Sequence, residues 1–346
     1  MTRIYLDHAA TTPLLPAARE AMEHGFALWA NPSSPHAEGR AARRALEDAR
    51  ARLKAALGWA GEVLFTSGAS EALALAIRAC AKPLAAVSAV EHEAVLRHAG
   101  ATCAMPGVDG AGLVDPADAG HGGLVCIQQV NNETGVIQPI DLLAGEARAR
   151  GGWLLADCAQ GAGKLPLPDC DMAAISAHKF GGPIGVGALL LRDFAMLRPG
   201  GGQERGYRAG TENLPGVLAM AAALEAGSQW LADAAGLRAR LDDAIRAAGG
   251  EVVADGAPRI PAIASYRMPG ISSAAQLIRF DAAGFAVSAG SACSSGSLKP
   301  SHVLTAMGYE GAGETIRVSI GRETSAGDIE RFLSVWTGMA GAARAA

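Results

Sequence analysis

The cysteines of the chain are few and widely spaced. None of the six occurs in a C-x-x-C motif, and a chain of 346 residues is longer than the small secreted domains that depend on disulfide frameworks. The spacing therefore predicts neither a metal site nor a disulfide framework. Most of these thiols are expected to be small core residues of a cytoplasmic protein, where they stay reduced. The six are Cys80, Cys103, Cys126, Cys158, Cys170 and Cys293.

Long apolar runs are also missing. No stretch reaches the roughly 18 apolar residues of a membrane span, and the first ten residues lack the apolar segment of a signal peptide. The 30 basic and 34 acidic side chains are interspersed and give a net charge of −4, so we expect no nucleic-acid or membrane partner. Hydrophobic residues make up 50% of the chain, enough for one large α/β domain or for a large domain with a smaller one.

Short apolar runs alternate with helical segments over most of the chain. Helices are expected over 37–57, 71–81 and 214–248. The alternation predicts parallel βαβ units in a doubly wound sheet, and the continuous apolar runs indicate that both faces of the sheet are covered. The predicted strands are 62–66, 84–90, 123–130, 153–156, 172–175 and 186–191.

The pattern changes after Gly249-Gly250, where shorter strands and helices follow. We therefore predict two domains. The large domain, which carries the doubly wound sheet, covers 13–245, and a smaller α+β domain combines 1–12 with 246–346.

Polar side chains follow five of the predicted strands. Ligands of such sheets bind outside the carboxyl ends of the strands, so these residues are expected to share one site. They are the Ser67–Ser70 turn, His92, Asn132, Asp157 with Gln160, and Ser176 with His178 and Lys179.

Lys179 follows the apolar run 172–175 after Ser-Ala-His and precedes Gly181-Gly182. Burial would disfavour the charged amine and lower its pKa, which suits a nucleophile or a Schiff base. The glycines would allow backbone or a ligand to come close. The alternative is an ordinary surface lysine at the end of a strand.

Three other groups complete a recognisable set. The Ser67–Ser70 turn opens a helix, where free amides and the helix dipole favour a phosphate, although an ordinary serine cap has the same sequence. Asp157 could hold a pyridine nitrogen protonated, or could simply cap a turn. His92 could stack on a flat ring or transfer protons, or could be a satisfied polar residue. Together with Lys179 they are the groups that bind pyridoxal 5′-phosphate (PLP).

Two residues in the C-terminal part of the chain are candidates for contact with a substrate. Cys293 lies in the glycine- and serine-rich stretch 288–297, so it is expected to be accessible and to act as a nucleophile, unless it is an incidental surface thiol. Arg317 alternates with apolar residues in 315–319. A buried arginine there needs an anionic partner, which is either a substrate carboxylate or an internal salt bridge.

With these motifs in place, the chain resembles the PLP-dependent cysteine desulfurases of the class V aminotransferase group, nearly from end to end. The resemblance implies the aspartate aminotransferase-like α/β architecture, fold type I. The first motifs that carry it are Tyr-Leu-Asp-x-Ala-Ala-Thr-Thr-Pro at 5–13, Phe-Thr-Ser-Gly-Ala-Ser-Glu at 65–71, Glu-His-x-Ala-Val at 91–95 and Val-Asn-Asn-Glu-x-Gly at 130–135. The others are Asp-x-x-Gln at 157–160, Ser-x-His-Lys at 176–179, Gly-Gly-Gly-Gln-Glu-Arg-Gly at 200–206, Arg-x-Gly-Thr at 208–211 and Gly-Ser-Ala-Cys at 290–293.

The resemblance implies a role for each residue that would contact the ring of the cofactor. Lys179 would form the internal aldimine with PLP. Asp157 would pair with the pyridine nitrogen, and Gln160 and Asn132 would bond the ring hydroxyl. His92 would stack on the ring and serve as acid and base.

It also implies how the phosphate is held. Ser70, Ser176 and His178 would bind it together with backbone amides of the turn at Ala69. Thr211 would reach the phosphate of the partner subunit, so the site would require a homodimer.

The substrate implied by the resemblance is L-cysteine. Arg317, with Asn31 as helper, would bind its carboxylate. The substrate would displace Lys179 from the cofactor, and the thiolate of Cys293 would then take the substrate sulfur as a persulfide while L-alanine leaves. The persulfide would pass to an acceptor such as an iron–sulfur scaffold protein or a tRNA-thiolation carrier.

The chain departs from this family at several positions. Ala74 stands where many relatives have asparagine, His8 replaces tyrosine or asparagine, and Phe-Gly-Gly follows Lys179 where the iron–sulfur-cluster (ISC) type has Ile-Tyr-Gly. The loop around Cys293 is similar to the longer loop of the nitrogen-fixation and ISC type rather than that of the SUF type. No catalytic group is lost, but the departures leave open which acceptor protein docks, because docking relies on surface and C-terminal features.

Other functions fit parts of the pattern. A selenocysteine lyase or another class V lyase or aminotransferase would use the same cofactor groups, although Cys293 argues against a plain aminotransferase. A catalytically inactive paralogue could act as a sulfur-carrier or cluster-assembly partner. Intact Lys179, His92 and Cys293 argue against that reading.

Overall fold

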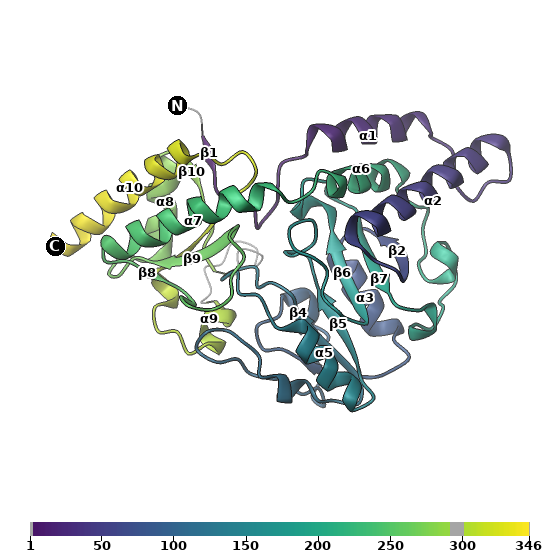
Figure 1. Cartoon of the computed structure of the whole chain (residues 1–346), viewed down its shortest axis with the longest axis horizontal. Coiled ribbons are helices and arrows are strands. Elements are labelled where there is room, and N and C mark those ends of the chain that lie inside the picture. The colour runs from purple at the N-terminus through teal and green to yellow at the C-terminus, as the bar shows by residue number, and fades with distance from the viewer. Residues whose placement is uncertain (1–2, 291–300, 346) are drawn as a thin grey trace.

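The computed structural model describes residues 3–290 and 301–345 (Figure 1). Within these residues the larger sheet has six strands in the order β2-β7-β6-β5-β4-β3. Strands β3 to β6 run parallel to one another, which confirms the mostly parallel α/β sheet expected from the alternating pattern. The strands are β2 (Glu62–Thr66), β3 (Leu84–Val87), β4 (Leu124–Gln128), β5 (Trp153–Asp157), β6 (Met172–Ser176) and β7 (Gly187–Leu191).

Strand β7 is the exception to the parallel arrangement. It pairs antiparallel with both of its neighbours, β2 and β6. The connection from β6 to β7 spans only residues 177–186 and contains the short 3₁₀ turn Ala177–Lys179. A parallel neighbour would need a crossover of a dozen or more residues, so this short connection reverses the chain direction.

Helices cover both faces of the larger sheet. Alternate residues of β4 belong to different cores: Val125 and Ile127 pack under α1, α2, α5 and α6, whereas Leu124 and Cys126 pack under α3 and α4. This two-sided burial explains why the strands are apolar throughout. The helices are α1 (Pro16–Ala27), α2 (Ala37–Leu57), α3 (Ala69–Ala79), α4 (Glu93–Leu96), α5 (Ile140–Ala149) and α6 (Leu214–Glu225).

The second part of the molecule is built on an antiparallel sheet with the order β11-β9-β8. Its core includes the aromatic side chains of Phe280, Phe332 and Trp336, and the rings of Phe280 and Phe332 stack at 4.7 Å. Its elements are α7 (Trp230–Ala247), β8 (Glu251–Val252), β9 (Ile263–Arg267), α8 (Ser273–Ala282), β10 (Phe285–Ala286), α9 (His302–Ala306), β11 (Thr315–Ser319) and α10 (Ala326–Ala345).

The helical stretch expected over 214–248 is two helices. The chain leaves the helix after α6 at Gly227, which has a φ of 71°, and resumes as α7. Ala234, Leu241 and Ile245 of α7 pack in the core of the second sheet. The division at residue 245 stays a prediction, and the packing of α7 leads us to propose a boundary near Gly227 instead.

Other elements begin and end close to their predicted limits. Helix α2 covers 37–57 as expected and ends at Gly58, which has a left-handed φ of 63°. Helix α3 begins at Ala69, two residues before the expected start, because the Ser67–Ser70 turn already contributes its first residues.

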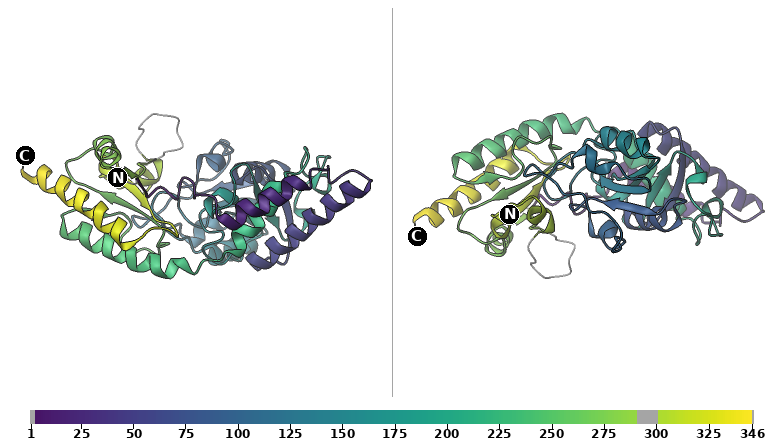
Figure 2. Two further views of the ribbon diagram at one scale, coloured as in Figure 1. Left: turned by 90° about the horizontal axis from the view of Figure 1, so that it is seen from above. Right: turned by 90° about the horizontal axis from the view of Figure 1, so that it is seen from below.

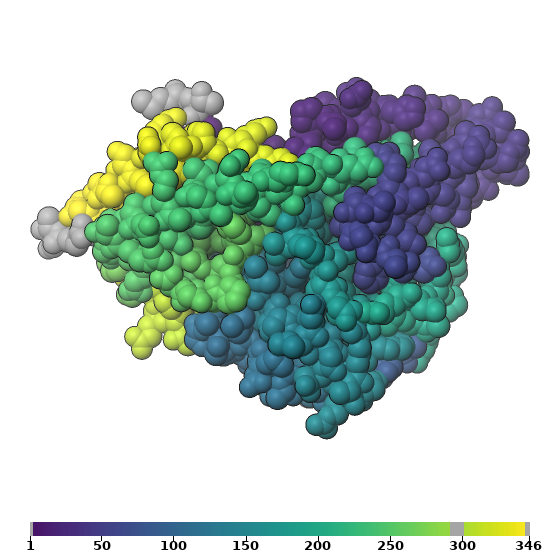
Figure 3. Space-filling view, viewed as in Figure 1, coloured from purple at the N-terminus to yellow at the C-terminus, as the bar shows by residue number. Residues whose placement is uncertain are grey.

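The N-terminal segment joins the two parts. Strand β1 (Ile4–Tyr5) pairs with β10 beside the second sheet, and the chain then crosses to α1, which packs on α6 (Figure 1). Figure 2 shows the two parts side by side along the long axis, and Figure 3 shows the green surface of α6 and α7 running from one part to the other. No helix in the described ranges is both long and apolar enough to cross a membrane.

Candidate active site

A cavity of about 390 Å³ lies at the carboxyl ends of β4, β5 and β6, beside the N-terminus of α3. This volume is within the usual range for a small-molecule site. It is where the strand-order rule for α/β sheets places a ligand. The predicted site residues that line it are Ala69, Ser70, His92, Asn132, Asp157, Gln160, Ser176, His178, Lys179 and Arg317.

Lys179 lies at the end of the 3₁₀ turn that follows β6. Its Nζ donates to the backbone oxygen of Ala9 at 2.7 Å and to that of Ala10 at 2.9 Å. The N-terminal segment is itself fixed to this turn, because the amide of Thr12 donates to the oxygen of His178 at 2.8 Å. The amine is therefore held at the cavity by two carbonyl groups from the other end of the chain.

The N-terminus of α3 forms one wall of the cavity. The first-turn amides of a helix have no acceptor within it, so at Ala69 and Ser70 they are available to an anion. The turn lies directly against β7: a Cβ atom on Gly187 would come within 2.6 Å of the Cα of Gly68. Gly187 is therefore required for this close approach. Ser176 and His178 line the same cavity from the end of β6.

The carboxyl group of Asp157 lines the cavity at the end of β5. Asp157 is buried there, and burial raises the pKa of its carboxyl group. The amide of Ala159 donates to its Oδ1 at 2.9 Å and opposes that shift, as do the charges of His92 and Lys179. A buried carboxylate of this kind is stabilised by a cationic partner, such as a protonated ring nitrogen.

His92 caps helix α4 as well as lining the cavity. Its Nδ1 accepts from the amide of Ala94 at 3.0 Å, so in the neutral ring Nε2 carries the proton. His178 is held by Thr11, whose Oγ1 lies 3.2 Å from its Nδ1. Burial, with the charges of Lys179 and Lys164, lowers the pKa of His178 to about 4. His178 therefore contributes as a neutral ring at neutral pH.

Arg317 is buried on β11 and reaches the cavity from the second sheet. Its Nη2 donates to Oδ1 of Asp7 at 2.8 Å, and its Nη1 donates to the backbone oxygen of Asn132 at 2.9 Å. The internal salt bridge considered from the sequence is thus present. Among the described residues its Nε has no partner.

Comparison with known proteins identifies the family of this chain. The profile of the family described as Aminotransferase class-V matches residues 4–332. The chain belongs to the aminotransferase class-V family. It is 39% identical to a cysteine desulfurase of Cereibacter sphaeroides, over 97% of this chain and 95% of that protein.

Solved structures agree with this assignment. The fold is similar to that of a NifS-like protein from Rickettsia africae, with a TM-score of 0.88 and 29% identity over 97% of this chain and 99% of that one. It is also similar to a structure of SspA in complex with cysteine, with a TM-score of 0.80 and 29% identity over 94% of this chain and all of that one. The fold-type-I architecture and the resemblance to cysteine desulfurases are therefore confirmed.

Two residues expected in the site of this family do not line the cavity, and a third lies outside the described residues. Thr211 and Asn31 are exposed and do not line it, and Oδ1 of Asn31 accepts from the amide of Ser33 at 2.9 Å. Cys293 lies outside the described residues. The roles expected of all three stay predictions.

Two described residues near 291–300, Ser288 and Ser301, contact residues that lie next to the cavity. Oγ of Ser288 donates to Oδ2 of Asp7 at 2.8 Å, and its backbone pairs with that of Arg317. Oγ of Ser301 donates to Oε2 of Glu133, next to Asn132, at 2.5 Å.

The structure adds residues that the sequence did not single out. Asp7 and the carbonyl groups of Ala9 and Ala10 belong to the motif at 5–13, for which the family resemblance implies no individual role. Ile184 lines the rim of the cavity although 77% of it is exposed. Lys164 is buried close to Lys179, and nothing in its apolar surroundings distinguished it.

Proposed function

We propose that this protein is a PLP-dependent cysteine desulfurase, a sulfurtransferase that converts L-cysteine to L-alanine and passes the sulfur to Cys293. The observation that carries the proposal is the cavity in which Lys179, the N-terminus of α3, Asp157 and Arg317 meet. The identity of 39% to a cysteine desulfurase over nearly the whole chain supports the same reaction.

The residues of the cavity fit PLP. The amine of Lys179 would attach the cofactor. Asp157 would keep the ring nitrogen of the cofactor protonated, and that cation would in turn stabilise the buried carboxylate of Asp157. Asn132 and Gln160 would bond the ring oxygen, and His92 would lie against the ring. When bound, PLP supplies an electron sink that labilises bonds at the α-carbon of an amino acid and at the carbon next to it.

The phosphate would be bound by neutral donors and a helix terminus. Amides at Ala69 and Ser70 point out of the first turn of α3, and hydroxyl groups of Ser70 and Ser176 line the same wall. His178, which is neutral at neutral pH, would donate one hydrogen bond there.

The substrate carboxylate would bind Arg317, whose guanidinium has donors left after those to Asp7 and Asn132. The thiolate of Cys293 would attack the substrate sulfur. A bond forms between the two sulfur atoms as the carbon–sulfur bond breaks, and the electron pair of that bond stays on the carbon. His92 would supply the proton that this carbon takes up to give L-alanine, and Cys293 would be left as a persulfide.

A homodimer is part of the proposal. Thr211 is exposed and does not line the cavity of its own chain, which suits a residue that reaches the site of a partner subunit. The loop that carries Thr211 is held to α3, the helix whose N-terminus would bind the phosphate. The contact is made by Arg208, whose Nε donates to Oε1 of Glu71 on α3 at 2.9 Å. The persulfide would pass to a sulfur-acceptor protein such as an iron–sulfur scaffold.

The test is a paired measurement on the purified protein. We would record the visible spectrum and the alanine and sulfide formed from L-cysteine with a thiol reductant, for the wild type, Lys179→Ala and Cys293→Ala. We expect a cofactor band that Lys179→Ala abolishes and Cys293→Ala keeps, with sulfide release lost in both variants. Activity that survives Cys293→Ala would contradict the persulfide route and favour a selenocysteine lyase or another class V lyase.

A further inference from the structure

A second amine is buried behind the site, and the proposed reaction gives it no role. Lys164 follows β5 in the turn that contains Gln160, and it is only 7% exposed. Its Nζ donates to the backbone oxygen of Gln160 at 3.1 Å and to the side-chain Oε1 of the same residue at 3.4 Å. Both contacts are therefore made to a residue that lines the proposed cofactor cavity.

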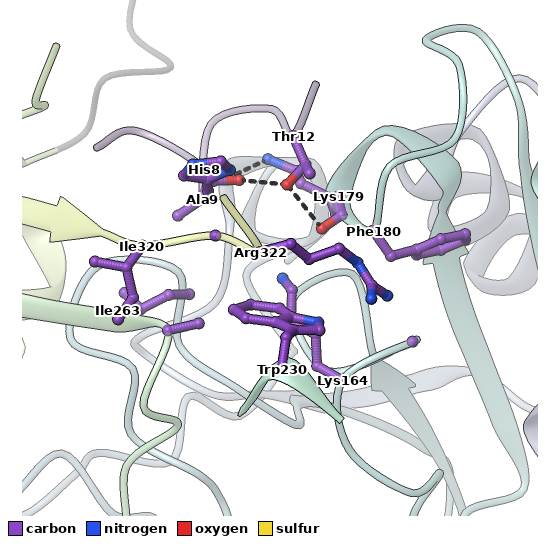
Figure 4. A pocket seen from close by; sticks show the side chains of 13 residues that line it. His8, Ala9, Thr12, Lys164, Lys179, Phe180, Trp230, Ile263, Ile320 and Arg322 are labelled. Atoms are coloured by element: carbon purple, nitrogen blue, oxygen red, sulfur yellow. Dashed lines mark hydrogen bonds between the residues drawn. The ribbon is translucent and has the colours of Figure 1, made fainter. Parts of the chain in front are cut away.

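Lys164 and Lys179 face the same small cavity of about 20 Å³ (Figure 4). The described residues that line it include no carboxylate. Burial, followed by the charge of Lys179, lowers the pKa of Lys164 to about 7. The other titratable or charged groups near it are His8, His178 and Arg322. An amine buried without an anion is costly, so its contacts require an explanation.

The hydrogen bonds of Lys164 continue to the active-site lysine. The amide of Gln160 accepts from Lys164 through Oε1 and donates from Nε2 to the backbone oxygen of Ala9 at 2.8 Å. Lys179 donates to that same oxygen at 2.7 Å. These two contacts fix the orientation of the Gln160 amide, with Oε1 towards Lys164 and Nε2 towards Ala9. The second N–H of Nε2 is then available as a donor to a ligand in the cavity that Gln160 lines.

We propose that Lys164 is a positioning residue that holds the side-chain amide of Gln160 with its N–H donor available to the ring oxygen of the cofactor. The inference rests on the proposed function, because it concerns the group that PLP would contact. It goes further by naming a residue that acts without touching the cofactor. A purely structural alternative is that Lys164 only satisfies the backbone oxygen of Gln160 in the turn after β5.

A double-mutant cycle separates these two roles. The variants are Lys164→Met, Gln160→Ala and the two combined, each loaded with PLP, and the readout is the apparent pKa of the visible cofactor band in a pH titration. Loss of a donor to the ring oxygen, like loss of a nearby positive charge, favours the protonated chromophore, so the apparent pKa should rise in Lys164→Met. We expect a rise of about one pH unit, which is tenfold in proton affinity. If Lys164 acts through Gln160, Lys164→Met should add little once Gln160 is alanine.

Two further variants make the result specific. Lys54→Met removes one positive charge from the surface end of α2 and should leave the band unchanged. Lys164→Gln keeps a donor to Gln160 without the charge, so the apparent pKa of the cofactor band should stay close to the wild-type value. If Lys164→Met fails to fold, Lys164→Ala, which also lacks the donor and the charge, takes its place in the cycle. An apparent pKa that stays at the wild-type value while the melting temperature falls would overturn the proposal in favour of the structural alternative. Additive shifts in the double variant would also overturn it.

The cofactor-free protein provides a separate readout. In a high-resolution structure of the Lys164→Met apoprotein we expect the Gln160 amide to leave the carbonyl of Ala9, whereas an unmoved amide would contradict the inference. If the wild type shows no cofactor band at all, the proposed function fails, and the position of this amide still decides whether Lys164 holds it.

Discussion

Nη2 of Arg317 donates to Oδ1 of Asp7 at 2.8 Å, across 310 positions of the sequence. The pair joins β11 of the second sheet to the N-terminal segment that holds Lys179. Ser288 donates to the other oxygen of Asp7, so one carboxylate orients both the guanidinium and the residues that precede the stretch with Cys293. Arg317 is therefore already oriented before any substrate binds, which lowers the entropic cost of binding a carboxylate.

This arrangement predicts a specific defect in Arg317→Lys. An ammonium group cannot contact both Asp7 and the oxygen of Asn132 and still present a planar pair of donors to a substrate carboxylate. We expect the KM for L-cysteine to rise about 10- to 100-fold, which corresponds to roughly 1.4 to 2.8 kcal/mol of binding. Steady-state assays of alanine formation measure the KM, and the visible cofactor band should be retained.

The matched control for this variant is Arg267→Lys on the neighbouring strand β9. Arg267 also contacts two carboxylates, those of Glu251 and Glu314, but it does not line the active-site cavity. Its replacement should leave the KM within about twofold of the wild type. Equal changes in both variants would show that loss of arginine on this sheet, and not loss of a substrate contact, causes the defect.

A pair of neighbouring arginines on α2 allows a test of burial. Arg50 binds Glu204 through two hydrogen bonds of 2.8 and 3.0 Å, and Arg52 binds Glu225 through two of 2.7 and 2.6 Å. The side chains of the first pair are 7% and 1% exposed, and those of the second are 43% and 42% exposed. Glu204→Gln removes the buried carboxylate that binds Arg50 through two donors and leaves that guanidinium only the partly exposed carboxylate of Glu47, at 3.1 Å. Glu225→Gln removes a carboxylate from a guanidinium that is solvated.

We expect Glu204→Gln to lower the free energy of unfolding by about 3 kcal/mol and Glu225→Gln to lower it by less than about 1 kcal/mol. Denaturant titrations of both variants and of the wild type measure the difference. Similar losses in the two variants would mean that geometry, which is bidentate in both pairs, matters more here than solvent exposure.

Much of the site could be predicted because its residues follow strands. His92, Asp157 and Lys179 come within four residues of the ends of predicted strands, and the carboxyl ends of parallel strands meet at one edge of a sheet. Helix α2 was predictable because its pattern ends at a glycine that adopts a left-handed conformation. In both cases the deciding information is local in the sequence.

The remaining parts of the site depend on contacts between distant residues. Lys179 is held by the backbone oxygen of Ala9, 170 positions away, and any residue would present the same oxygen. Lys164 is surrounded by glycines and apolar residues, so its burial beside Lys179 becomes visible only in three dimensions. The reversed direction of β7 depends on the tertiary path of a short loop. Local sequence patterns therefore do not predict these contacts.

The exposed side chain of Ile184 at the rim of the cavity leads to a prediction about the proposed homodimer. Ile184 is 77% exposed although it lines the cavity, and an exposed isoleucine beside a proposed shared site suits contact with a partner subunit. If the proposed homodimer forms, we expect Ile184→Glu to shift it to monomer in light scattering coupled to size-exclusion chromatography. Ile278→Glu on α8 is the control, because Ile278 is 71% exposed but does not line the cavity. A dimer that survives Ile184→Glu would place the subunit contact elsewhere.

His8 predicts a measurable dependence of stability on pH. Its ring packs against Gly321, where a Cβ atom would come within 2.2 Å of it, and among the described residues its Nδ1 has no partner. Burial, with the charge of Lys164, lowers the pKa of His8 to about 4. Between the unfolded pKa of about 6.5 and this value, the unfolded chain binds a proton that the folded protein does not. His8 therefore removes stability as the pH falls through this window.

His8→Asn has no titrating group at this position, and asparagine retains a polar side chain of smaller size. The fall in the free energy of unfolding from about pH 6.5 towards pH 4 should be shallower in this variant than in the wild type, by about 1 kcal/mol per pH unit. Urea titrations at several pH values measure the slope, and His24→Asn, on the exposed last turn of α1, should not change it. His178 titrates in the same direction in all these proteins and cancels in the comparison. Equal slopes in His8→Asn and the wild type would mean that His8 is protonated in the folded protein despite its burial.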